Sequence, residues 1–168
     1  MSCLEGFVTH TLQPVYDKNS NVLILGTIPS PKSREYGFYY GHRQNRFWKV
    51  LAALFQAEIP IDNESKKQFV LSRHIALWDV LASCTISGAS DSSIKNPVPN
   101  DIGRILSDAN IRAIITTGQK AFALYQRYCE PSTHRKAICL PSTSPANCRN
   151  CGLEDLIQEY QVILKFLS

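Results

Sequence analysis

The sequence lacks the features that mark membrane-bound and secreted proteins. Its longest uninterrupted run of aliphatic and aromatic residues covers only residues 50–55, whereas a helix that spans a bilayer needs ~20 such residues. The first residues contain no basic segment followed by an apolar one, the pattern of a secretion signal. We therefore expect a cytoplasmic protein that has no membrane partner.

Motifs of several enzyme classes are also missing. The sequence has no GxGxxG, GxxxxGKS or GxxxxGKT loop to hold the phosphates of a nucleotide, and no GxSxG turn for a serine nucleophile. The four histidines have no metal-ligand spacing, and Cys148 and Cys151 form a lone CxxC pair without the second pair that a tetrahedral zinc site needs. The sequence therefore predicts no metal and no nucleotide cofactor, and we interpret the six cysteines as reduced thiols.

Charge is scarce and unevenly distributed. Only 19% of the 168 residues are charged and 44% are hydrophobic, a composition that supports one domain over residues 1–168, which we expect to be monomeric. Five basic residues and one acidic residue lie within residues 32–49, which therefore account for the whole net charge of +4. Residues 131–153 contain basic residues and no Asp or Glu. Both stretches are interpreted as loops, and each is either a solvated face or a surface for a polyanion.

Apolar runs and helical spacing alternate along the chain. Short apolar runs predict strands over residues 22–25, 75–78, 111–116 and 136–140. Helices are predicted after Asn45 and over residues 64–74, 101–109, 118–129 and 153–167, whereas residues 81–100 are expected to form a loop. This alternation is typical of a parallel sheet covered by helices on both faces, in which binding residues follow the carboxyl ends of the strands.

Five motifs lie mostly on the loops that follow these strands. They are LILGTIPS at residues 23–30, YYGHRQNRFW at 39–48, ALWDV at 76–80, DSSI at 91–94 and LPSTSPAN at 140–147. Together they resemble the uracil-DNA glycosylase superfamily, and most closely its hypoxanthine-DNA (deoxyinosine) glycosylase branch. The resemblance extends from near Val22 to the C-terminal helix. It implies an α/β fold, a three-layer αβα sandwich with a central four-stranded parallel sheet.

The resemblance also implies a reaction. A monofunctional DNA glycosylase hydrolyses the N-glycosidic bond of a deaminated base in DNA, here hypoxanthine, and leaves an abasic site without any cofactor. The sugar departs as a cation, so the enzyme needs only a positioned water and stabilisation of the leaving base. Two alternatives stay open: a glycosylase specific for uracil or a mismatched base, and a non-catalytic relative that binds damaged DNA.

Asn45 is the catalytic residue that the resemblance implies. Many members of the superfamily place Asp or Asn in the loop after the first strand, but this chain has Ile28 and Pro29 there, and Ile28 cannot orient a water. In the hypoxanthine branch the functional Asn comes from the YYGHRQNRFW block, where it corresponds to Asn45. An alternative interpretation is that Asn45 only caps the following helix, which contributes ~1 kcal/mol to stability.

Further site residues are carried over from the same motifs. The base-binding pocket is expected to contain Gly26, Thr27, Ile28, Pro29, Tyr40, Phe47, Trp78 and Asp79. A flipped base stacks on an aromatic ring, for which Tyr40 and Phe47 are both candidates, and Asp79 either contacts the base or caps the next turn. The residues expected to bind DNA are Ser30, His42, Arg43, Pro141, Ser142, Thr143, Ser144, Asn147 and Arg149. Leu140 stands where many members have a His that hydrogen-bonds the departing base, so electrophilic help must come from elsewhere.

Overall fold

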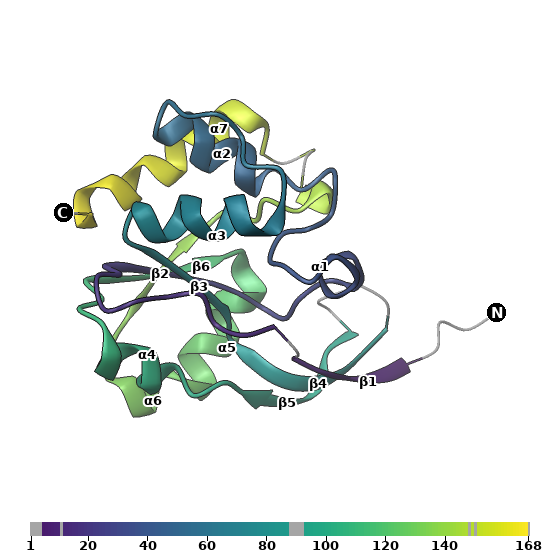
Figure 1. Cartoon of the computed structure of the whole chain (residues 1–168). Coiled ribbons are helices and arrows are strands. Elements are labelled where there is room, and N and C mark those ends of the chain that lie inside the picture. The colour runs from purple at the N-terminus through teal and green to yellow at the C-terminus, as the bar shows by residue number, and fades with distance from the viewer. Residues whose placement is uncertain (1–4, 11, 88–92, 148, 150, 168) are drawn as a thin grey trace.

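A parallel sheet forms the centre of the molecule (Figure 1). The computed structural model describes residues 5–10, 12–87, 93–147, 149 and 151–167. The four parallel strands run in the order β3 (Ile75–Asp79), β2 (Val22–Gly26), β6 (Ala113–Thr117) and β7 (Ala137–Leu140). All five residues of β2 and of β3 are buried. The predicted strands therefore form because uninterrupted apolar runs can bury both faces of a parallel sheet.

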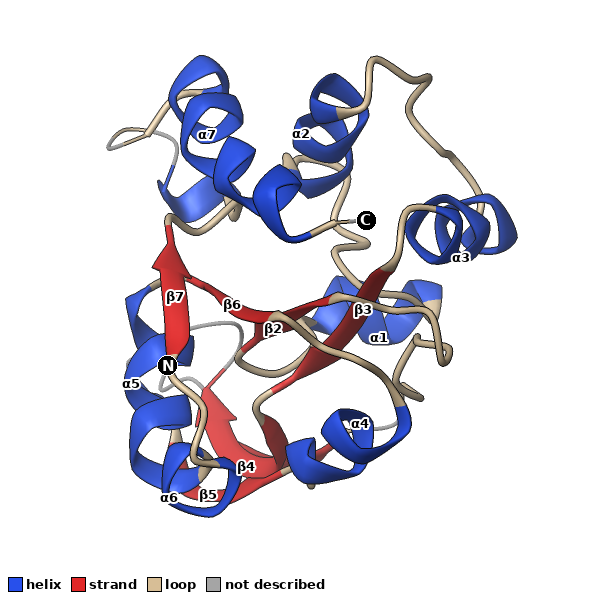
Figure 2. Cartoon of the chain, turned by 90° about the vertical axis from the view of Figure 1, so that its left-hand side faces the viewer, coloured by secondary structure: helices blue, strands red, loops and turns tan. Residues whose placement is uncertain are grey.

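Helices cover both faces of this sheet, as Figure 2 shows. One layer contains α2 (Phe47–Leu54), α3 (Asn63–Ser72) and α7 (Leu153–Tyr160), which continues as a 3-10 helix over Gln161–Phe166. The opposite layer contains α4 (Ile102–Asp108), α5 (Gln119–Tyr128) and α6 (Glu130–Thr133). The predicted αβα sandwich is confirmed. No helix in the described part of the chain is both long and apolar enough to cross a membrane.

A second sheet contradicts the predicted loop over residues 81–100. The antiparallel strands β1 (Glu5–Thr9), β4 (Leu81–Ser87) and β5 (Lys95–Pro99) lie in the order β1-β4-β5. Leu81, Cys84 and Ile86 are buried along β4, while the residues between them are partly exposed. The Ser, Asn and Pro residues that suggested a loop are tolerated because this sheet buries one face and its prolines lie on an edge strand.

A short helix also interrupts the first basic stretch, which had been expected to form a loop throughout. Helix α1 (Pro31–Tyr36) begins after Ser30, whose side chain accepts a hydrogen bond from the Ser33 N–H group (3.1 Å). Proline suits the first turn of a helix, and the helix ends at Gly37, whose φ of 76° is left-handed. The loop prediction was wrong here because the start and stop signals enclose only six residues.

The strand register brings the predicted loops to one edge of the parallel sheet. Gly26 at the end of β2 is paired with Asp79 at the end of β3. On the other side of β2, Thr117 ends β6 and is paired with Leu140, the last residue of β7. The chain segments that follow these four residues therefore start side by side.

Candidate active site

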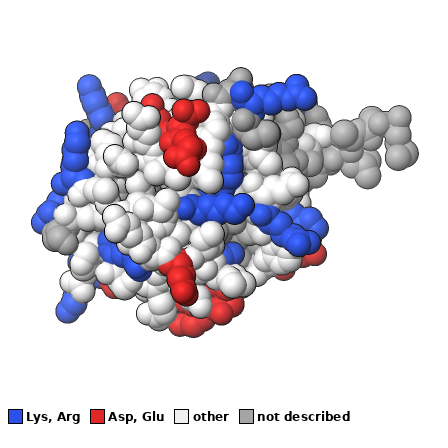
Figure 3. Space-filling model, turned by 90° about the horizontal axis from the view of Figure 1, so that it is seen from above, with Lys and Arg blue, Asp and Glu red and all other residues white. Residues whose placement is uncertain are grey.

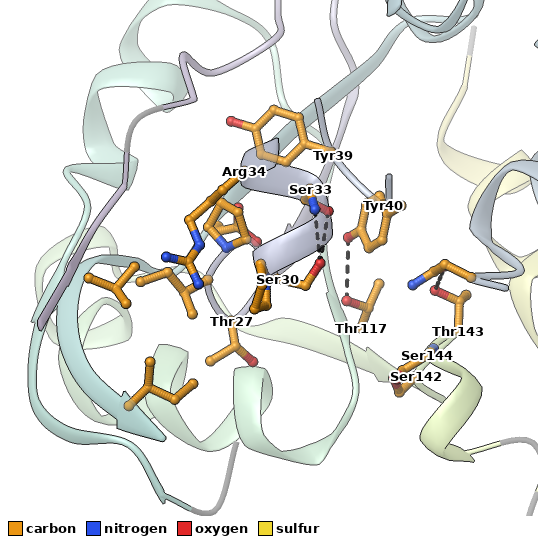
Figure 4. A pocket seen from close by; sticks show the side chains of 18 residues that line it. Thr27, Ser30, Ser33, Arg34, Tyr39, Tyr40, Thr117, Ser142, Thr143 and Ser144 are labelled. Carbon is orange, nitrogen blue, oxygen red and sulfur yellow. Dashed lines mark hydrogen bonds between the residues drawn. The ribbon is translucent and has the colours of Figure 1, made fainter. Parts of the chain in front are cut away.

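A cavity of about 150 Å³ opens at this carboxyl edge (Figure 4). Its walls come from the loop after β2, helix α1, the segment before α2, the ends of β3 and β6, and the loop after β7. The predicted site residues that line it are Gly26, Thr27, Ile28, Pro29, Ser30, Tyr40, Asn45, Asp79, Ser142, Thr143 and Ser144. The structure thus brings together side chains that are more than 100 positions apart in the sequence.

Asn45 lines the cavity and directly precedes Arg46, the N-cap of α2, so the predicted N-cap is displaced by one residue. Its Oδ1 accepts hydrogen bonds from the Phe47 N–H group (2.9 Å) and from the Thr143 hydroxyl (2.8 Å). Because a backbone N–H can only donate, the amide orientation is fixed with Oδ1 toward the helix. The amide Nδ2 has no hydrogen-bond partner among the described residues and is left to interact with a ligand. Asn45 is therefore not the N-cap itself, but its oxygen still binds the first N–H group of α2 while its nitrogen faces the cavity.

Tyr40 provides the aromatic surface of the cavity. Its ring stacks on Phe47 with centroids 3.8 Å apart and an angle of 16° between the planes. Phe47 is fully buried and does not line the cavity, which corrects its assignment to the pocket. The Tyr40 hydroxyl lies 3.4 Å from the Thr117 hydroxyl, and burial raises the pKa of Tyr40 so that the phenol stays neutral. Tyr40 is therefore a rigid, uncharged platform backed by Phe47.

Trp78 also lies outside the cavity. Successive side chains on a strand point to opposite faces, so the adjacent Trp78 and Asp79 cannot both reach the same space. The Trp78 ring packs instead near His10 and beneath the Arg104 guanidinium, whose carbon lies 5.7 Å from the ring centroid. The assignment of Trp78 to the pocket was therefore wrong, and only its neighbour Asp79 lines the cavity.

Asp79 presents a buried carboxyl to the cavity. His10 Nε2 donates a hydrogen bond to Asp79 Oδ2 (2.9 Å), and the two side chains are only 3% and 6% exposed. Asp79 Oδ1 lies 2.5 Å from the position that a Cβ on Gly26 would occupy, and it has no hydrogen-bond partner among the described residues. Burial raises the pKa of Asp79, and the hydrogen bond and charge of His10 oppose that rise. The carboxyl does not cap the next turn, because the N–H groups of Val80 and Leu81 donate to the Gly26 and Thr27 carbonyls instead.

Sequence reasoning did not assign Thr117 or Arg34, which line the cavity, or His10, which lies behind it against Asp79. Thr117 directly follows the predicted strand over residues 111–116, a position where binding residues are expected. Arg34 lies on α1 within the basic stretch, and its buried Nε has no partner in the described part of the chain. No sequence pattern indicates His10, because it precedes every motif and meets Asp79 only through a contact 69 positions away.

The residues expected to bind DNA fall into three groups. Ser30, Ser142, Thr143 and Ser144 line the cavity, whereas His42 and Arg43 border an adjoining hollow that also touches Asn45. Two residues shape the last loop from within: Pro141 accepts a hydrogen bond from the Tyr160 hydroxyl (2.6 Å), and Asn147 Nδ2 donates to the Ser142 carbonyl (3.0 Å). Arg149 is exposed.

Some expectations concern residues that the structure does not describe. Cys148 of the CxxC pair, and Asp91 and Ser92 of the DSSI motif, lie outside the described residues. Cys151 is a buried free thiol. Among the described residues, no three His, Cys, Asp or Glu side chains gather as a metal site requires.

Positive charge is not concentrated over the helices α2, α3 and α7. Figure 3 shows the molecule from that side, with Lys and Arg side chains scattered between Asp and Glu. Near the cavity, Arg34 lines its wall, and Arg43, Lys49 and Lys66 border the adjoining hollow. Contacts with a polyanion are therefore expected along the rim of the cavity rather than on a broad basic face.

The sequence matches a known protein family over most of its length. The model of the "Uracil DNA glycosylase superfamily" matches residues 13–164. The chain belongs to this superfamily. This DNA glycosylase is 32% identical over 140 residues to a hypoxanthine DNA glycosylase of Methanosarcina barkeri (strain Fusaro), a match that covers 82% of this chain and 87% of the relative.

Two further similarities support the assignment. A hypoxanthine DNA glycosylase of Methanosarcina acetivorans is 31% identical over 137 residues, which cover 80% of this chain and 85% of the relative. The solution NMR structure of a uracil DNA glycosylase candidate from Methanosarcina acetivorans matches with a TM-score of 0.78 and 26% identity, over 95% of this chain and 99% of that one. The DNA glycosylase described here thus shares both sequence and fold with the family.

Proposed function

We propose that this DNA glycosylase removes hypoxanthine from DNA by hydrolysing its N-glycosidic bond and leaves an abasic site. The observation that carries the proposal is the cavity in which Asp79 Oδ1, the Tyr40 ring and the Asn45 amide converge. The two relatives named hypoxanthine DNA glycosylases support the choice of base. A base inside a duplex cannot reach such a cavity, so the nucleotide must be flipped out of the stack.

Recognition of the base begins with Tyr40 and the loop after β2. The flipped base stacks on the Tyr40 ring, which Phe47 holds from behind at 3.8 Å. Stacking is favourable for any base, since every base has a π-face, so this contact binds the base without selecting it. Selection must come from polar groups at the base edge.

Asp79 supplies such a polar group. An ionised carboxylate only accepts hydrogen bonds, and Asp79 Oδ1 is the oxygen left open by His10. Hypoxanthine carries a hydrogen on ring nitrogen N1, whereas adenine has a lone pair there, so the carboxylate favours the deaminated base. Uracil carries a comparable ring N–H group, which keeps a uracil-specific enzyme as the alternative.

Asn45 positions the attacking water in this mechanism. Both lone pairs of Asn45 Oδ1 are engaged by Phe47 and Thr143, so the water is held by Nδ2. The Nδ2–H group donates to one lone pair of the water oxygen, and the other lone pair of that oxygen attacks the sugar carbon. The C1′–N9 bond breaks with its electron pair going to the base, the water oxygen bonds to C1′, and the proton released neutralises the base. A cationic sugar needs no strong base to activate the water.

An activity panel tests the proposal. Duplexes carrying hypoxanthine, uracil, xanthine or mispaired thymine are incubated with the enzyme under single-turnover conditions, and abasic sites are cleaved with alkali. We expect the fastest cleavage with hypoxanthine. Cleavage only at uracil or thymine would support the alternative specificity, and binding to all duplexes without base release would identify a non-catalytic damaged-DNA binder.

A further inference from the structure

We propose that His10 is a positioning residue that fixes Asp79 for base recognition. Its Nε2–H group holds Oδ2, which favours the carboxylate form and leaves Oδ1 directed at the cavity, where it accepts a hydrogen bond from the ring N–H group of a deaminated base. This inference rests on the proposed function and names the residue on which its selectivity depends.

The geometry of the pair gives the carboxyl only one open oxygen. Nε2 and Oδ2 are 2.9 Å apart, and neither side chain is more than 6% exposed. A buried carboxylate is strongly unfavourable unless it is paired and hydrogen-bonded. Oδ2 satisfies that requirement through His10, but Oδ1 has no described partner and lies against Gly26 in the cavity wall. An acceptor that lines a cavity and has no hydrogen bond to the described residues is available to the donor of a ligand.

The antiparallel sheet places His10 next to the Asp79 carboxyl. Thr9, the last residue of β1, is paired with Ser83 of β4, and the His10 N–H group then donates to the Ala82 carbonyl (2.6 Å). The imidazole ring lies between two aromatic rings, with its centroid 6.0 Å from Tyr39 and 6.4 Å from Trp78. His10 precedes the residues that the family model matches, 13–164.

His10 is the described side chain that opposes the effect of burial on the pKa of Asp79. The other titratable or charged side chains around the carboxyl are Tyr39 and Tyr40, from the segment before α2, and Arg34, which lines the same cavity. Burial raises the pKa values of both tyrosines, so these phenols stay neutral. Burial also raises the pKa of Asp79, and His10 lowers it. Without His10 the carboxyl would therefore be protonated at a higher pH.

Protonation would reverse the recognition. A protonated carboxyl carries an O–H group and can donate, which suits the lone pair on adenine N1 better than the N–H group of hypoxanthine. Excision of hypoxanthine should therefore fall as the pH drops through the pKa of Asp79. A variant without the His10 donor should lose activity at a higher pH than the wild-type enzyme.

Two variants separate the donor from its packing. His10→Phe keeps a ring between Tyr39 and Trp78 but removes the N–H donor, whereas His10→Gln keeps an N–H donor. Single-turnover excision of hypoxanthine is measured from pH 5 to 9. We expect His10→Phe to move the acidic limb up by roughly one pH unit or more, which lowers excision about tenfold at any pH on that limb. His10→Gln should recover part of both effects.

A base analogue supplies a second readout. Unsubstituted purine lacks the ring N–H group, so the wild-type enzyme should prefer hypoxanthine to purine, and His10→Phe should reduce that preference. A folded His10→Phe protein with the wild-type pH profile and preference would overturn the inference alone. A wild-type protein that releases no base from any duplex would overturn the proposed function as well.

A titration covers the case in which His10→Phe does not fold. The Asp79 carboxyl carbon is followed by ¹³C NMR in the wild-type and His10→Gln proteins. We expect a higher midpoint in His10→Gln, because a neutral amide replaces a group that can carry charge. Equal midpoints would show that His10 does not control Asp79.

Discussion

One side chain, Asn45, connects the helix layer to the chemistry at the scale of single residues. Its carboxamide oxygen holds the start of α2 and the Thr143 hydroxyl, and its nitrogen remains for the water. Stability and activity therefore depend on different atoms of the same residue. Substitutions that remove one atom or both can separate the two roles.

Asn45→Ala should lose both contributions. Loss of the hydrogen bond to the start of α2 should lower the free energy of unfolding by ~1 kcal/mol, and loss of the polar group that holds the water should slow single-turnover excision ~100-fold or more. Asn45→Asp keeps the acceptor oxygens but lacks Nδ2, so it should retain the stability and still excise slowly. Denaturant melts and excision rates measure the two effects. Full activity in a folded Asn45→Ala protein would remove Asn45 from the mechanism.

Gly26 tests how closely the cavity wall is fitted to Asp79. A Cβ at residue 26 would lie 2.5 Å from Asp79 Oδ1, whereas one at Gly6 on β1 would have no atom within 4 Å. We expect Gly26→Ala to displace the carboxylate and to slow hypoxanthine excision by roughly 10- to 100-fold, in the range of one lost polar contact. Gly6→Ala should excise normally. Equal rates for the two variants would contradict the close approach of Asp79 to this wall.

Motif position predicted the site better than it predicted individual contacts. The loops after β2 and β7 were correctly expected to meet, because parallel strands end at one edge of the sheet. Trp78 was misplaced because the alternation of side chains along β3 was not applied to it. His10 could not be found at all, since no local pattern reports a contact between residues 69 positions apart.

At the scale of elements, the start of α2 and the loop after β7 behave as one unit. The Arg46 N–H group donates to the Thr143 carbonyl (3.1 Å), and the Arg46 guanidinium contacts the carbonyls of Ser144 (3.1 Å) and Cys151. The Thr143 hydroxyl adds the contact to Asn45. This loop therefore holds the catalytic amide in place as well as lining the cavity.

Removing the Thr143 hydroxyl should loosen that unit. Thr143→Val keeps the shape of the side chain but leaves Asn45 Oδ1 with one donor fewer, so we expect a stability loss of ~1 kcal/mol and roughly tenfold slower excision. Thr143→Ser keeps the hydroxyl and should remain close to wild type in both thermal melts and single-turnover rates. If the Val and Ser variants were equally active, the anchoring role would be wrong.

The elements that the sequence failed to predict share a physical cause. Strands β4 and β5 are only partly buried and rich in residues typical of loops, and the pairing of β4 with β1 and with β5 outweighs a weak local preference. The strands of the parallel sheet were predicted because complete burial demands an apolar run that a sequence displays directly. Helix α1 is only six residues long and buries little apolar surface.

At the scale of the whole molecule, the charge near the rim of the cavity should govern affinity for DNA. Each phosphate contact that is lost lowers the slope of log K against log salt by ~1. We expect Arg34→Ala, Arg43→Ala and Arg149→Ala each to flatten the slope similarly for damaged and undamaged duplexes. Lys18→Ala, at the opposite edge of the sheet before β2, should leave it unchanged. If all four variants kept the slope of the wild-type enzyme, the basic stretches would be solvated faces.

The order of strands in the parallel sheet has a consequence for synthesis of the protein on the ribosome. The cavity draws its walls from residues between Val8 and Ser144, and β7 pairs only with β6, on the edge away from β2. While the chain emerges, β6 remains an open edge, which is prone to wrong pairing until β7 arrives. A nascent chain therefore acquires its base-binding cavity only after β7 and the loop up to Ser144 have emerged, so a product that stops before this loop lacks one wall of the cavity.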